Sequence, residues 1–145
     1  MLTEAQLKLT WLVANHLTGK SILIRQRQPA TAGTWGEAHK TEGGQLVIDL
    51  SPKIPDHKRL YVILHEIAHH KRHNFLATKV YKAKPGTLEQ EPSTLHSRLS
   101  EGGANMQAAE WQAWAEQHAN PQLYKAAPLE AALIALLEYP QEGDK

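Results

Sequence analysis

The chain has 145 residues, of which 41% are apolar, and a formal net charge of +1, which suits one domain with a modest core. Acidic and basic residues are mixed along the sequence, which argues against the dense basic face of a dedicated nucleic-acid-binding protein. Cysteine is absent, so disulfide bonds are excluded and a metal ion would need nitrogen or oxygen ligands. The sequence shows neither a signal peptide nor an apolar run long enough to span a bilayer, and we expect a soluble, cytoplasmic protein.

The first half of the sequence predicts a helix followed by two or three strands. Thr3 fits the first position of a capping box, and Gly19 fits the end of the helix that follows. The branched, apolar segments SILIRQRQ (21–28) and GQLVIDL (44–50) predict strands. A short third strand is expected around residues 34–40.

The second half predicts helices. Asp56 is a candidate N-cap for a helix over residues 57–73, in which apolar residues recur at steps of three and four. Residues 82–93 contain two prolines and are expected to form a loop. Helical patterning resumes near Thr94, falters at the glycine pair 102–103 and continues to residue 118.

A last apolar helix is expected over residues 128–138, before a polar tail. The order of helix, strands and further helices indicates an α+β fold. We expect residues 1–140 to form a single domain and residues 141–145 to form a flexible tail.

The stretch HEIAHH (65–70) lies within the predicted helix 57–73. Residues four positions apart share one face of a helix, so His65 and His69 can direct their rings at one metal ion. Zinc binds imidazole nitrogen well, and its catalytic sites combine three protein ligands with a water molecule. Glu66 is placed to accept a proton from that water and to pass it to a leaving amine. Manganese or iron would also accept two histidines and a carboxylate.

Two more histidines follow the motif. His70 and His73 lie next to Lys71 and Arg72, whose positive charge disfavours a second cation nearby. We therefore expect His70 and His73 to be surface groups or groups that contact a metal ligand.

The third ligand is not defined by spacing, because no histidine follows at the short distance of a three-histidine site. In a continuous helix Glu101 and Asn105 would share a face, whereas Glu110 would point the opposite way. Gly102 and Gly103 raise the alternative that Glu101 stands at the start of a helix. The residues alone leave Glu101, Glu110, Glu89, Glu91 and no third protein ligand as alternatives.

Aromatic residues provide further candidates. Trp35 lies in a glycine-rich segment without an apolar pattern and is a candidate for the lining of a cleft. Strand 44–50 is expected either along that cleft, as an edge that pairs with a peptide, or in the sheet interior. The other three tryptophans are expected in the core or partly in it: Trp11, Trp111 and Trp114. The candidates to stabilise an oxyanion are Tyr61, Tyr81, Tyr124 and His96.

Two segments together resemble the ImmA/IrrE family of small HExxH zinc metallopeptidases, which bacteria and their mobile elements encode. They are IDLSPKIPDHKRLYVILHEIAHHKRH and EGGAN, within about residues 44–73 and 100–110, less than a third of the chain. The resemblance implies a zincin-like domain with zinc held by His65, His69 and Glu101, and with Glu66 as the general base. It also implies that Asn105 orients a ligand, and that the partner is a protein substrate, often a helix-turn-helix repressor, with no direct binding to nucleic acid or membrane.

Two other readings remain at this point. A zincin-like domain can serve as a binding or regulatory module without hydrolysing peptides, although the presence of Glu66 argues against a degenerate site. A protease of SprT type, acting on DNA-bound proteins, would be expected to have a third histidine and a more basic surface.

Overall fold

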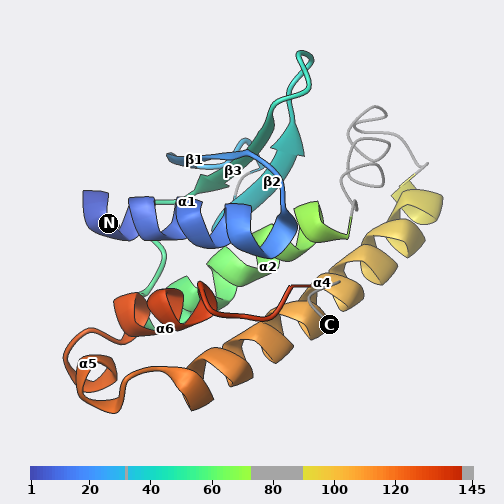
Figure 1. Ribbon diagram of the computed structural model, residues 1–145. Helices are drawn as coiled ribbons and strands as arrows, with labels where there is room; N and C mark the ends of the chain where they lie inside the picture. Colours follow the sequence, from blue (N-terminus) through green and yellow to red (C-terminus); the bar gives the residue numbers. More distant parts are fainter. Residues whose placement is uncertain (32, 73–89, 142–145) are drawn as a thin grey trace.

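The computed structural model describes residues 1–31, 33–72 and 90–141, with side chains from residue 101 onward in the last range, and shows an α+β fold (Figure 1). In chain order the elements are α1 (Glu4–Thr18), β1 (Ile22–Gln26), β2 (Gly36–Lys40), β3 (Leu46–Leu50), the 3₁₀ turn η1 (Asp56–Lys58), α2 (Arg59–Lys71), α4 (Gln90–His118), α5 (Pro121–Ala126) and α6 (Pro128–Leu136). None of the helices in this described part has the length and apolar character needed to cross a membrane.

The sheet has three strands in the order β1-β3-β2, so β3 is its centre. Strand β3 runs parallel to β1 and antiparallel to β2, and Ile48 lies opposite Ile24 on one side and Ala38 on the other. The expectation that segment 44–50 forms an edge along a cleft is therefore wrong, and the interior alternative is correct. A nearly continuous apolar run is typical of a strand covered on both faces, and the edge strand that contacts α2 is β2.

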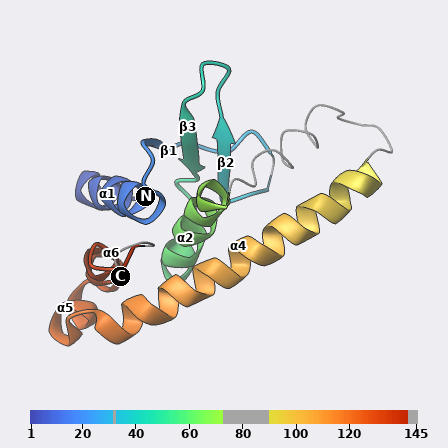
Figure 2. The ribbon, with the colours of Figure 1, turned by 45° about the vertical axis from the view of Figure 1, so that its right-hand side comes forward.

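Helix α2 lies between the sheet and α4, and α1 and α6 lie side by side next to it (Figures 1 and 2). Ile48 and Leu50 project from one face of the sheet into the core, where they join Ile63 and Ile67 of α2 and Trp111 of α4. This packing buries α2 on two sides.

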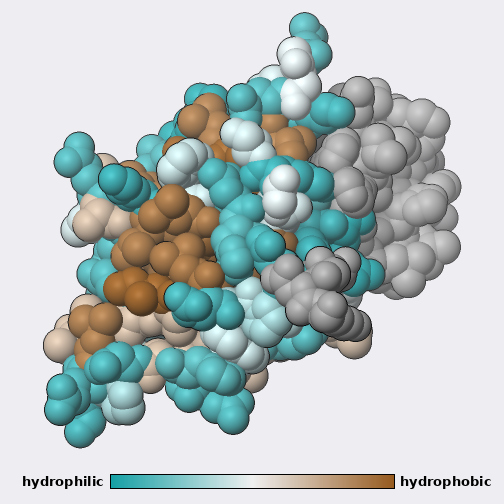
Figure 3. All heavy atoms as spheres, in the orientation of Figure 1, coloured by the Kyte–Doolittle hydropathy of each residue, from teal (hydrophilic) through white to brown (hydrophobic). Residues whose placement is uncertain are grey.

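Helix α1 begins and ends where the sequence predicts. Thr3 forms the capping box with Gln6, and Gly19 ends the helix at a φ of 69°, a conformation that glycine adopts without steric cost. Trp11 does not enter the core, contrary to expectation, because it is 42% exposed. Figure 3 shows apolar side chains gathered where α1 and α6 lie side by side, the helices that carry the exposed Trp11 and Ile134.

Asp56 does not cap α2, contrary to prediction. It stands in η1, where its carboxylate pairs with Arg59 at 3.0 Å, and α2 begins only at Arg59, without a side-chain cap. The helix ends at Lys71, slightly before the predicted residue 73, which lies outside the described residues. The Lys20 amine donates to the carbonyl of His70 at 2.7 Å and so satisfies one acceptor at this helix end.

Helix α4 runs without a break from Gln90 to His118, so the predicted interruption at the glycine pair is wrong. The predicted loop 82–93 is wrong for residues 90–93, and its other residues lie outside the described part of the chain. The buried stripe of Ala104, Ala108, Trp111 and Ala115 packs into the core. Such packing outweighs a cost of up to about 1 kcal/mol for each glycine in a helix. A Cβ on Gly103 would lie 2.6 Å from Nε of Arg72, so this glycine leaves room for the Arg72 side chain, which extends from the end of α2.

The C-terminal part contains one helix that the sequence did not predict. Helix α5 is capped by Asn120, whose side chain accepts a hydrogen bond from the amide of Leu123, and α6 ends at Leu136 rather than at residue 138. Gln141, the last described residue, donates to the carbonyl of His16 at 2.6 Å and thus lies against α1. The rest of the predicted tail lies outside the described residues.

Asp49 forms a buried ion pair on the sheet face that points away from the core. Arg25 of β1 donates to its two carboxylate oxygens at 2.7 and 3.0 Å, and Nε2 of His39 lies 2.9 Å from it. Burial alone would raise the pKa of Asp49, but the hydrogen bonds from Arg25 and His39 lower it. The carboxylate therefore links all three strands.

Replacement of Asp49 by Ala is expected to lower the free energy of unfolding at pH 7 by about 2–4 kcal/mol, because Arg25 loses its buried partner. The lowered pKa means that Asp49 stabilises the fold above the ordinary aspartate pKa of about 3.9, and that this contribution is lost as the pH falls toward the lowered value. The difference in the free energy of unfolding between wild type and variant should therefore become smaller below about pH 4. Urea unfolding at a series of pH values measures it.

Asp56→Ala is the matched control, because Asp56 also pairs with an arginine but is exposed. It is expected to cost less than about 1 kcal/mol. Equal losses in the two variants would contradict the structural role given to Asp49.

Candidate metal centre

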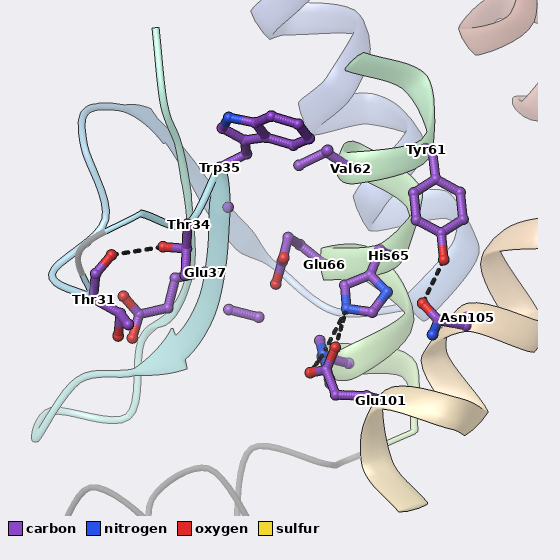
Figure 4. Close-up of a pocket in the computed structure, with 13 residues that line it drawn as sticks. Thr31, Thr34, Trp35, Glu37, Tyr61, Val62, His65, Glu66, Glu101 and Asn105 are labelled. Carbon is purple, nitrogen blue, oxygen red and sulfur yellow. Dashed lines mark hydrogen bonds and ion pairs between the residues drawn. The ribbon is translucent and has the colours of Figure 1, made fainter. Parts of the chain in front are cut away.

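Helix α2 presents the HExxH residues toward two different neighbours. His65 and His69 face α4, and Glu66 faces the edge strand β2 (Figure 4). Glu66 is only 7% exposed, and both imidazoles are largely buried. Because α2 is packed between the sheet and α4, these polar groups leave water on folding and need partners within the protein.

Glu101 of α4 is the partner of both imidazoles. Its Oε2 lies 2.8 Å from Nε2 of His65, and its Oε1 lies 2.9 Å from Nε2 of His69 (Figure 4). The two Nε2 atoms are 3.2 Å apart, and the imidazole rings are nearly perpendicular. The unbroken helix α4 places Glu101 within a helix rather than at its start.

This donor set fits a zinc ion. Ligand atoms at about 2.0–2.1 Å from zinc and at tetrahedral angles are separated by about 3.3 Å. The separations of 2.8, 2.9 and 3.2 Å are close to that value, and a small outward movement of the carboxylate would admit the ion. Two imidazoles and one carboxylate leave the fourth position of a tetrahedral ion for water or substrate.

The other acids considered from the sequence do not join this cluster in the described structure. Glu110 lies elsewhere on α4, where its carboxylate accepts a hydrogen bond from the hydroxyl of Tyr139 at 3.2 Å. Glu89 and the side chain of Glu91 lie outside the described residues. The prediction that Glu101 and Glu110 cannot share the site agrees with these positions.

Glu101 and His65 each favour the charged form of the other. Partial burial alone would raise the pKa of Glu101, but the hydrogen bonds from His65 and His69 lower it far below its usual value. Burial alone would lower the pKa of His65, but its hydrogen bond to Glu101 and the charge of Glu66 raise it. A metal ion bound here would compete with a proton for the ring nitrogen of His65, because histidine binds a metal in its neutral form.

Glu66 is buried and forms a hydrogen bond with the backbone of Ala38 in β2. Burial raises the pKa of its carboxyl group above the usual value, while the nearby His69 and His65 and the backbone amide of Ala38 act in the opposite direction. A carboxyl group with a raised pKa, beside the candidate metal ligands, suits a group that accepts and returns a proton.

A pocket of about 550 Å³ opens over these residues. Its walls come from β2 and the preceding segment on one side and from α2 and α4 on the other (Figure 4). Trp35 lines the pocket, as expected, and is 40% exposed. Tyr61 also lines it, whereas the hydroxyl of Tyr124 contacts Glu116 instead. Tyr81 and the side chain of His96 lie outside the described residues.

His70 is not a surface group, contrary to expectation. Its side chain is fully buried, and Nε2 lies 2.8 Å from the carbonyl oxygen of Val47 in β3. Burial lowers its pKa to about 4, so the imidazole is neutral at pH 7. His70 thus joins α2 to the sheet, on the side away from Glu101. His73 lies outside the described residues.

Gly36 is a residue of the site that sequence reasoning missed. A Cβ at this position would lie 2.9 Å from Cγ of Glu66 and 2.9 Å from Cγ1 of Val62. Strand β2 can approach α2 this closely only because residue 36 has no side chain. The sequence did contain a signal, since a glycine inside a strand often marks the close approach of another segment.

Replacement of Gly36 by Ala is expected to displace Glu66 and to lower the free energy of unfolding by about 1–3 kcal/mol, the range for overpacking. Thermal unfolding measures the loss, and a crystal structure of the variant measures the displacement. Gly43→Ala is the control, because a Cβ there would lie 3.9 Å from its nearest neighbour, the hydroxyl of Thr41. An unchanged stability and Glu66 position in Gly36→Ala would show that the approach of β2 to α2 is looser than described.

The native protein is expected to bind about one zinc ion per chain. Replacement of Glu101 by Ala is expected to remove most of this zinc, because only two imidazoles then remain as ligands. Native mass spectrometry of protein without a histidine tag measures the stoichiometry. Glu110→Ala, on the same helix, should retain the ion. Full zinc occupancy in Glu101→Ala would exclude Glu101 as a ligand.

Comparison with known proteins assigns no relative to this chain. No protein-family model matches it, and no significant match is found among curated proteins or solved structures. What the site can do must therefore be argued from its own geometry.

Proposed function

We propose that the protein is a zinc-dependent metalloendopeptidase of ImmA/IrrE type with a zincin-like fold. The observation that carries the proposal is the meeting of His65, His69 and Glu101 beside the buried carboxyl group of Glu66. These residues come from two helices, and Glu101 lies 32 positions after His69 in the sequence. Two imidazoles paired with one carboxylate from another helix are not expected of a histidine-rich helix that faces only solvent.

In this proposal His65, His69 and Glu101 hold the ion, which polarises the attacking water and the substrate carbonyl group when it is bound. Glu66 accepts the proton of the water as it attacks the peptide carbon. The same carboxyl group then donates that proton to the nitrogen of the breaking peptide bond. The raised pKa of the buried Glu66 makes its carboxylate a stronger base, which favours the first of these two steps.

The edge strand β2 supports a peptide as substrate. One side of β2 pairs with β3, and β2 also forms one wall of the pocket. An extended peptide can add to such an edge through backbone hydrogen bonds, which would bring its carbonyl groups over the candidate metal centre. Trp35 and Tyr61 are exposed aromatic residues on the two sides of Glu66 and would contact side chains of the peptide.

The identity of the substrate follows only from the resemblance of the sequence to the family. That resemblance favours a separate cytoplasmic protein as substrate, such as a helix-turn-helix repressor. The mixed charge of the chain agrees with a protein partner rather than with nucleic acid.

Replacement of Glu66 by Gln is expected to reduce peptide hydrolysis by about 10²- to 10⁴-fold, the usual contribution of a general acid–base. The amide keeps the size of the carboxylate, and Glu66 is not a proposed ligand, so zinc content should be unchanged. Zinc-loaded protein is incubated with a peptide library derived from bacterial proteins and with purified repressors, and mass spectrometry identifies the products.

Glu42→Gln, in the exposed turn between β2 and β3, is the control and should cleave like wild type. Zinc binding without any cleavage by wild type would favour the alternative of a zincin-like binding module. Cleavage that is equal in wild type and Glu66→Gln would mean that another group accepts the proton.

A further inference from the structure

Tyr61 and Asn105 form a second contact between the helices that carry the candidate ligands. Tyr61 lies one helical turn before His65 on α2, and Asn105 lies one turn after Glu101 on α4. The Tyr61 hydroxyl donates a hydrogen bond to Oδ1 of Asn105. The pairs Tyr61–Asn105 and His65–Glu101 therefore join the two helices at successive turns (Figure 4).

The same two side chains surround the ring of His65. The phenol ring of Tyr61 stacks on the imidazole, with 6.0 Å between centroids and 29° between planes. The Asn105 carboxamide also lies near the imidazole, one turn of α4 from Glu101 (Figure 4). Nε2 of His65 is directed at Glu101, and Nδ1 is buried without a hydrogen bond of good geometry among the described residues.

A histidine that binds a metal through one ring nitrogen usually donates a hydrogen bond from the other, which fixes the orientation of the ring. Asn105 Oδ1 is an acceptor near His65 with room for a second hydrogen bond, since an amide oxygen has two lone pairs and Tyr61 occupies one. Phenylalanine could not take over this role of Tyr61, because the hydroxyl group holds the Asn105 carboxamide in its orientation. Its engagement with Asn105 also makes Tyr61 a poor candidate for stabilising an oxyanion.

We propose that Tyr61 is a positioning residue of the metal centre: its hydroxyl orients Asn105, which in turn orients His65 and keeps α4 in register with α2. The inference rests on the proposed function insofar as it takes His65 to be a metal ligand. The inference gives a role to a residue that would not itself bind the metal. It also explains why the large aromatic side chain of Tyr61 on α2 is 36% exposed.

Replacement of Tyr61 by Phe tests the inference without any substrate. The variant is expected to bind zinc about 10-fold more weakly than wild type, the lower end of the range for loss of such outer contacts. Competition with a chromophoric zinc chelator measures the dissociation constant. Tyr124→Phe is the matched control, because it removes a tyrosine hydroxyl that contacts Glu116, away from the pocket.

Asn105 distinguishes positioning from general support of the fold. Asn105→Asp keeps the acceptor oxygen and should bind zinc within a few-fold of wild type, whereas Asn105→Leu should weaken binding by about 10- to 100-fold. If Tyr61 acts on His65 only through Asn105, Tyr61→Phe should add little to the loss of zinc affinity caused by Asn105→Leu. Unfolding of each variant without zinc provides a check that the fold is retained.

The outcomes separate this inference from the proposed function. Zinc binding by wild type with an unchanged dissociation constant in Tyr61→Phe, or with fully additive losses in the double variant, would overturn the positioning role alone. Failure of wild type to bind zinc would overturn the proposed function and this inference with it. A loss in Tyr61→Phe that Tyr124→Phe does not share would support the inference.

Discussion

The burial of α2 on two sides is the constraint on which the rest of the structure depends. The sheet covers one side of this helix through Ile48 and Leu50, and α4 covers another. A helix in that position would normally be apolar throughout, yet α2 carries three histidines and a glutamate between its apolar residues. Each of these groups loses water on folding, and each has a partner from another element that limits the cost.

Much of the candidate site could be predicted because its spacing is local. The four-residue separation of His65 and His69 defines a common face on any helix, and the same argument places Glu101 and Asn105 together. Helix spacing showed only that Glu101 and Glu110 cannot share one site, and the choice of Glu101 came from the resemblance of EGGAN to a family motif. The capping box at Thr3 and the end of α1 at Gly19 are also local, and the structure confirms both.

What the sequence did not reveal depends on contacts between distant segments. The central place of β3 follows from parallel pairing with β1, for which neither strand contains a local signal. The charged residues that follow His70 in the sequence suggested an exposed position, but the side chain of His70 lies on the face of α2 that packs against the sheet. Gly103 predicts a weak point in a helix, yet the space it leaves is filled by Arg72 from another helix.

The pairing of Glu101 with both imidazoles has a consequence for how the protein would exist without metal. In a zinc finger the ligands repel or stay unsatisfied until the ion arrives, so folding waits for the metal. Here a carboxylate already compensates the two histidines, and the core is formed by other residues. The fold would therefore persist without metal, and under the proposed function the supply of metal would decide when the site becomes active.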